Sequence, residues 1–182
     1  MDYEIALKNS WNVVKGNLVT FIVGLLIAVV GSIFIVTIAP LAYGFISMAV
    51  KGARGEQIEI SDVFVGFNKD DFIRSWTFML IYIVIATILG QIASILSTIV
   101  GILFMFTMPL LVIKGYNGIE GIKESIEIIK KAPVECVIVY VIMLVLNLIG
   151  TLLLGIGLLV TVPISSVFLA NATFELSGES VK

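Results

Sequence analysis

The chain contains no histidine and only one cysteine, Cys136, among its 182 residues. The lack of histidine excludes imidazole acid–base catalysis and imidazole metal ligands. The single cysteine excludes an intramolecular disulfide and a cysteine metal cluster. Charged residues make up 13% of the chain, about half of the roughly 25% of an average soluble domain. No basic run suggests nucleic-acid binding. We therefore expect no metal, no cofactor and no nucleic-acid partner.

Apolar residues, in contrast, make up 59% of the chain, and the mean hydropathy is +1.15. A soluble surface needs polar groups, so this composition indicates that lipid covers the outside. Three runs without any charge cover residues 16–50, 75–113 and 136–174, and they are 35, 39 and 39 residues long. One span needs about 20 residues, so each run is predicted to form two spans joined by a tight turn. The six predicted spans are residues 14–31, 33–51, 73–91, 95–114, 134–150 and 156–175.

The predicted fold is thus all-α: a polytopic transmembrane bundle of six helices in three hairpins, forming one integral membrane domain over residues 1–182. Lysine and arginine are absent from the three predicted turns and occur only at the termini and in the two long connections. By the positive-inside rule, both termini and both connections are expected in the cytoplasm, with the protein in the cell membrane. The start, Met1-Asp2-Tyr3-Glu4, lacks signal-peptide features, so the first apolar run is expected to be retained.

The connections are predicted to contain short amphipathic cytoplasmic helices. In residues 119–131 four isoleucines share one helical face, and charged residues occupy the rest; residues 3–15 have a similar stripe. Such helices lie either in the membrane interface or as straight extensions of the spans that follow. The sequence leaves both arrangements open.

A threefold internal repeat is also predicted, with units at residues 3–52, 61–115 and 118–176. Each unit would consist of a leading helix, a span, and a second span that contains a proline. Pro40, Pro109 and Pro163 are the prolines in question, and each is expected to kink its helix. Such kinks line ligand sites in some transporters, although we favour a packing role. The alternative to a repeat is convergence of simple apolar sequences.

A short motif follows the first hairpin: Arg54-Gly55-Glu56, and then Asp62-Val63-Phe64-Val65-Gly66-Phe67. Together with Pro40-Leu41, Gly44 and the stretch from Gly155 to Pro163, it resembles a group of uncharacterised prokaryotic six-span membrane proteins. That group is similar to the membrane domain fused to some glycerophosphodiester phosphodiesterases. The soluble phosphodiesterase domain, with its catalytic histidines and metal-binding acids, has no counterpart in this sequence. The resemblance therefore implies a fold and a membrane location, but no activity.

The polar residues near or within the spans are the candidates for a site. Gly55 is expected to end the second span in the left-handed conformation, with Ser61 as the N-cap and Asp62 as a first-turn acid of a short helix. Arg54 would pair with Glu56 or Asp62. The candidate ligand residues are Arg54, Glu56, Asp62, Gln91 and Asn147, and the alternative for Asn147 is an interhelical hydrogen bond.

These observations favour a non-catalytic membrane protein. No nucleophile-elbow, P-loop or metalloprotease motif is present, and no acid lies within the three uncharged runs that hold the predicted spans. We expect a lipid-interacting or partner-binding module, with membrane lipids, a cytoplasmic protein or a second copy of the chain as partners. The alternative is an uncoupled transporter or permease for a small or lipidic solute, since coupled transport usually requires ionisable residues in the spans.

Overall fold

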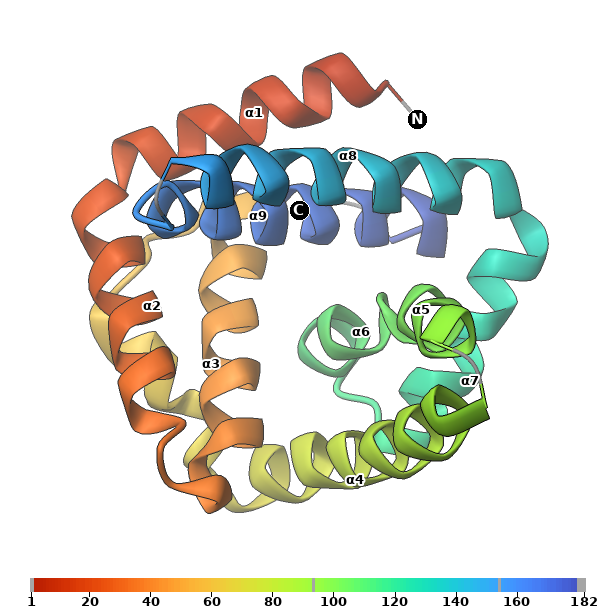
Figure 1. Cartoon of the computed structure of the whole chain (residues 1–182). Helices are drawn as coiled ribbons and strands as arrows, with labels where there is room; N and C mark the ends of the chain where they lie inside the picture. Colours follow the sequence, from red (N-terminus) through yellow and green to blue (C-terminus); the bar gives the residue numbers. More distant parts are fainter. Residues whose placement is uncertain (1, 93, 154, 180–182) are drawn as a thin grey trace.

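A computed structural model describes residues 2–92, 94–153 and 155–179, and these residues fold entirely into helices and connecting turns (Figure 1). The predicted all-α class is therefore confirmed. The elements in chain order are α1 (Tyr3–Gly16), α2 (Leu18–Gly31), α3 (Ile35–Ala53), the 3₁₀ helix η1 (Ile60–Phe67), α4 (Lys69–Ile92), α5 (Ser94–Phe104), α6 (Thr107–Lys114), α7 (Gly118–Lys131), α8 (Pro133–Leu152) and α9 (Leu158–Ser177).

Several of these helices are long and apolar enough to cross a membrane, which identifies the chain as a membrane protein. Within the described residues there are five: α3, α4, the α5–α6 pair over Leu96–Lys114, α8 and α9. The predicted span at residues 14–31 differs. Its helix begins at Leu18, and its 14 residues extend only about 21 Å, which is less than the roughly 30 Å hydrocarbon core.

The reason for the shorter helix is a sharp corner at Asn17, where α1 and α2 meet at 87°. The backbone amide of Asn17 donates to the carbonyls of Val13 and Val14, and its side-chain amide also donates to Val13. These bonds close the last turn of α1. Val14 and Phe21, one on each side of the corner, are fully buried and belong to the same apolar cluster. The bend rules out α1 as a straight extension of α2.

The other helix limits follow from ordinary capping chemistry. Asn117 caps α7 by accepting from the amides of Ile119 and Glu120 at 3.0 and 2.9 Å, while the Glu120 side chain accepts from the Asn117 amide. Pro133 begins α8 at a position where no backbone donor is needed. Gly115, at φ 64°, follows α6 in the left-handed conformation. The apolar face of α7 is buried against the bundle through residues that include Ile122 and Ile128.

The described elements form three groups in chain order, α1–α2–α3, η1–α4–α5–α6 and α7–α8–α9. Each group begins with a short helix of at most 14 residues and ends in the helix that contains Pro40, Pro109 or Pro163. The short helix of each group packs on the proline-bearing helix of another, η1 on α3, α7 on α6, and α1 on α9. The three proline-bearing helices also contact one another. The elements therefore close into a ring around α3, α6 and α9 (Figure 1). The sequence repeat itself stays a prediction.

The three prolines do not have equivalent surroundings. Pro40 and Pro163 are each the sixth residue of their helix, α3 and α9. Pro109 is instead in the first turn of α6, where the missing N–H is already outside the helical ladder. The predicted kink at Pro109 is therefore replaced by a break between α5 and α6 that precedes it. At Pro40, the carbonyl of Val36 accepts a hydrogen bond from Trp76 Nε1 at 3.0 Å, so this carbonyl is used in packing.

Candidate functional site

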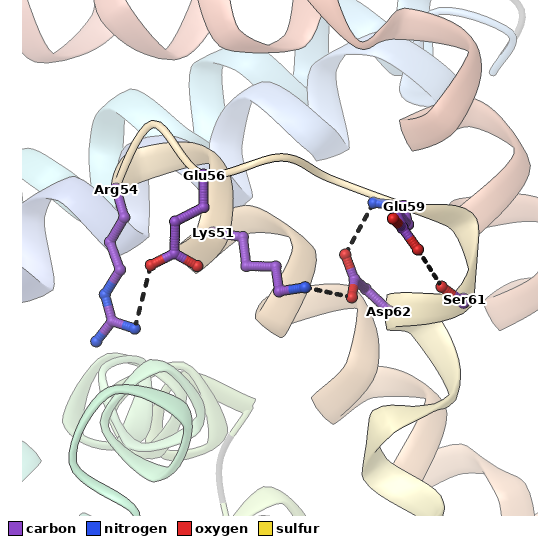
Figure 2. Close-up of polar contacts among 6 residues, drawn as sticks. All are labelled: Lys51, Arg54, Glu56, Glu59, Ser61 and Asp62. Atoms are coloured by element: carbon purple, nitrogen blue, oxygen red, sulfur yellow. Dashed lines mark hydrogen bonds and ion pairs between the residues drawn. The ribbon is translucent and has the colours of Figure 1, made fainter.

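The motif after α3 forms two separate ion pairs (Figure 2). Arg54 caps α3, and Gly55 follows it at φ 71° as predicted. The Arg54 guanidinium lies 3.8 Å from Glu56 Oε1, so Arg54 pairs with Glu56, one of its two predicted partners. Asp62, the other predicted partner, pairs with a different residue. The guanidinium also lies over the ring of Phe174 in α9, 5.3 Å from its centre. Arg54 therefore joins the ends of α3 and α9.

Asp62 is buried and has a structural partner for each oxygen. Lys51 Nζ lies 2.5 Å from Oδ1, and the backbone amide of Glu59 donates to Oδ2 at 2.8 Å. Glu59, rather than the predicted Ser61, is the N-cap of η1, because the helix begins at Ile60, two residues earlier than predicted. Ser61 instead donates its hydroxyl to Glu59 at 3.1 Å. Asp62 is a first-turn acid as predicted, and its contacts fix the connection to α3.

Two further charged clusters were not anticipated from the sequence. At the end of α6, Lys114 Nζ lies 3.6 Å from Glu124 and 3.4 Å from Glu179, and 5.5 Å from the centre of the Tyr116 ring. The ends of α3, α6 and α9 meet here, because Val50 and Phe174 pack with residues that include Ile113. The only sequence signal for this cluster was that Lys114 directly follows an uncharged run.

The second cluster joins α3 to α4. The Tyr43 hydroxyl donates to Asp71 Oδ1 at 2.9 Å, and Arg74 lies 3.1 Å from the same oxygen. On the outer face of α7, Lys130 Nζ lies 2.7 Å from Glu127, and this hydrogen bond and charge lower the pKa of the Glu127 carboxyl. Charged side chains thus pair with neighbours in the chain at several points along the connections.

The remaining two candidates lie in other parts of the fold. Gln91 is exposed in the last turn of α4. Asn147 is half-buried in α8, and its Oδ1 is buried without a hydrogen-bond partner among the described residues. The interhelical hydrogen bond considered for Asn147 is therefore not found at this oxygen. Thr161 Oγ1 in α9 is also buried and unpartnered within the described part of the chain, and it packs against Gly150 of α8.

A cleft of about 390 Å³ lies between α1 and α9, and we name it the polar cleft because five of its eight lining residues are polar or charged. Asp2, the N-cap of α1, and Asn9 of α1 line one side, and Asn171 of α9 and Glu179, which follows α9, are among the residues on the other. Asn171 also donates to the buried Ser10 hydroxyl at 3.2 Å, which fixes α1 on α9. The cleft contains none of the five candidate residues.

An apolar groove of about 490 Å³ lies on the other side of α1, between α1, α8 and α9. Its lining residues are Leu7, Trp11, Leu146, Leu153, Gly157, Val160, Thr161 and Ile164. Every atom that faces this groove is apolar, which means that Thr161 contributes its methyl group and not its hydroxyl. Sequence patterning could not reveal the groove, because one of its walls comes from α1, which is distant in the chain from α8 and α9.

Among the described residues, no group of three or more cysteine, aspartate or glutamate side chains is arranged to hold a metal ion. Comparison of the chain with family models, curated proteins and solved structures gave no match in any of the three.

Proposed function

We propose that this chain is a non-catalytic integral membrane protein that interacts with membrane lipids. The observation that carries the proposal is the apolar outer surface of the long helices. In α8 alone the side chains of Leu144, Val145, Leu148 and Leu152 are between 46% and 75% exposed. Contact of this much apolar surface with water is unfavourable, whereas contact with the hydrocarbon of a membrane is not. Charged side chains with little exposed surface are used in ion pairs within the chain, as at Lys51–Asp62.

The proposed topology places α3, α4, α5–α6, α8 and α9 across the membrane, with the bent α1–α2 pair as the sixth element. Lysine and arginine gather at the chain ends and in the connections, which supports a cytoplasmic position for both termini and both connections in the cell membrane. The ion pairs that join the connections to the bundle provide a rigid charged face there. A cytoplasmic protein or a second copy of the chain would dock on that face.

The direct test is to purify the full chain from membranes in a mild detergent and identify what accompanies it by native mass spectrometry. We expect retained phospholipid at a defined number of molecules per chain. Incubation with a lipid extract should leave the lipid composition unchanged. A chain that retains no lipid, or one that converts any lipid to a new product, contradicts the proposal.

A second candidate function is uncoupled transport of a small or lipidic solute. The unpartnered oxygens of Asn147 and Thr161 favour it, because buried polar atoms of this kind mark places where a polar ligand or water can bind. The polar cleft at Asn9 and Asn171 would be its entrance on one side. Reconstituted vesicles that exchange a solute faster than protein-free vesicles would support this alternative.

Substitution of Asn147 by leucine separates a packing role from a ligand role. Leucine has a similar branched shape and removes the buried oxygen without a partner, so we expect the free energy of unfolding to rise by about 1 kcal/mol. Titration of the detergent-solubilised protein with sodium dodecyl sulfate measures this change. Solute exchange should stay at its original rate in the variant. A loss of exchange would instead indicate that Asn147 binds a polar ligand, and a less stable variant would indicate that Asn147 makes a stabilising contact within the folded chain.

A further inference from the structure

The groove between α1, α8 and α9 exists because α1 folds back along α9. Residues later in α1 lie near residues earlier in α9. Asp2 and Glu179 line the same polar cleft, and Ser10 bonds to Asn171. Trp11 then lines the apolar groove with Val160. The two helices are therefore antiparallel, and α8 packs on α9 as well (Figure 1). The groove is the space left where α1 and α8 both lie on α9.

The mouth of the groove opens on the apolar outer surface. Two of its lining side chains, Trp11 and Leu153, are 48% and 61% exposed. Leu152 and Ile156 beside this mouth are 75% and 71% exposed. In a membrane protein this surface faces hydrocarbon, so the groove is continuous with the lipid phase.

Water is a poor occupant of such a groove. A buried water normally needs two to four polar partners, and the groove-facing atoms offer none. Two lining residues carry a polar side-chain atom: Thr161 presents its hydroxyl to Gly150 on the far side, and the indole nitrogen of Trp11 does not face the groove. An empty groove would also lack van der Waals contacts along its walls.

We propose that this groove seats one hydrocarbon tail of a membrane phospholipid. The proposal rests on the proposed lipid interaction and gives it a site. Lipid tails are as apolar as the side chains, so moving a tail from bulk lipid into the groove gains no hydrophobic free energy. The seated tail is held instead by van der Waals contact with the walls of the groove. Three helices surround the tail, and the stretch of α9 from Gly157 to Ile164 gives it about 10 Å of wall. The headgroup remains outside the groove and does not select the lipid.

The test fills the groove in the full chain and counts retained lipid. The protein is reconstituted in nanodiscs of dioleoyl phosphatidylcholine, or of dioleoyl phosphatidylglycerol, and then examined by native mass spectrometry. We expect one retained lipid of either headgroup and about tenfold lower occupancy in Val160→Trp, whose indole would occupy the groove. Leu153→Trp closes the mouth from an exposed position, so it gives the same readout if Val160→Trp fails to fold.

A matched control defines the outcome. Leu148→Trp adds the same indole to the exposed surface of α8 outside the groove and should retain lipid as the original chain does. Equal occupancy in all variants overturns the groove assignment but leaves the proposed lipid interaction standing, whereas absence of retained lipid from the original chain overturns both. A strong preference for one headgroup means that a polar group is recognised and also overturns the assignment.

Discussion

Replacement of Gly44 by alanine should lower the free energy of unfolding by about 3 kcal/mol or more. A Cβ at this position would collide with the backbone carbonyl of Val63 in η1. A side chain could avoid such a collision by changing its rotamer, but a backbone carbonyl cannot. Helix α3 and η1 would have to separate, with loss of the contact between Gly66 and Pro40 as well. Titration of the detergent-solubilised protein with sodium dodecyl sulfate, followed by far-ultraviolet circular dichroism, measures the effect.

Two further glycines provide the matched tests. Gly66→Ala should be as harmful as Gly44→Ala, because its Cβ would strike the Pro40 backbone. Gly101→Ala in α5 has no atom within 4 Å of the added Cβ and should be neutral or slightly stabilising through helix propensity. If Gly44→Ala were as stable as Gly101→Ala, the close approach of η1 to α3 would be wrong.

Replacement of Asp62 by asparagine should lower the free energy of unfolding by about 2 kcal/mol. This loss is smaller than that for a fully buried ion pair, because Lys51 is one-third exposed and water screens its charge. Asparagine can still accept from the Glu59 amide, so the main loss is the charge that faces Lys51. The measurement is again a titration with sodium dodecyl sulfate, and η1 should become more susceptible to limited proteolysis.

The control is Asp70→Asn, which removes an exposed carboxylate from the first turn of α4 and should change stability by less than about 0.5 kcal/mol. Lys51→Met should destabilise by an amount similar to Asp62→Asn, and the double variant should lose less than the sum of the two. Additive losses would show that Lys51 and Asp62 do not interact in the folded protein.

The candidate site was predictable only where neighbouring residues act on one another. Gly55 as a helix terminator, Asp62 in a first turn and the Arg54–Glu56 pair are all local features, and the structure has each of them. The partner of Asp62 could not be predicted in the same way. Lys51 lies 11 positions away and reaches Asp62 only because η1 folds back on α3.

The same distinction applies to the first hairpin. The length of the uncharged run at residues 16–50 predicted two spans, but composition cannot locate a break between equally apolar neighbours. The chain bends at Asn17 because α1 is held against α9, where Ser10 is bonded to Asn171, and α2 therefore begins only at Leu18. A contact with the last helix of the chain therefore determines where the first helix of the hairpin begins.

The sequence by itself determined that this is an all-helical membrane protein, where its charges gather and which glycine ends α3, because hydropathy and backbone conformation are local properties of the chain. Only the tertiary structure decided that α1 folds back on α9, that Lys51 pairs with Asp62, and that an apolar groove forms between three helices. Each of these depends on packing between segments distant in sequence, where the shapes of both partners set the outcome. The absence of histidine excluded imidazole catalysis and imidazole metal ligands, and the low charge content indicated a lipid environment. The packing of α1 on α9 formed the groove in which we propose that a lipid tail binds.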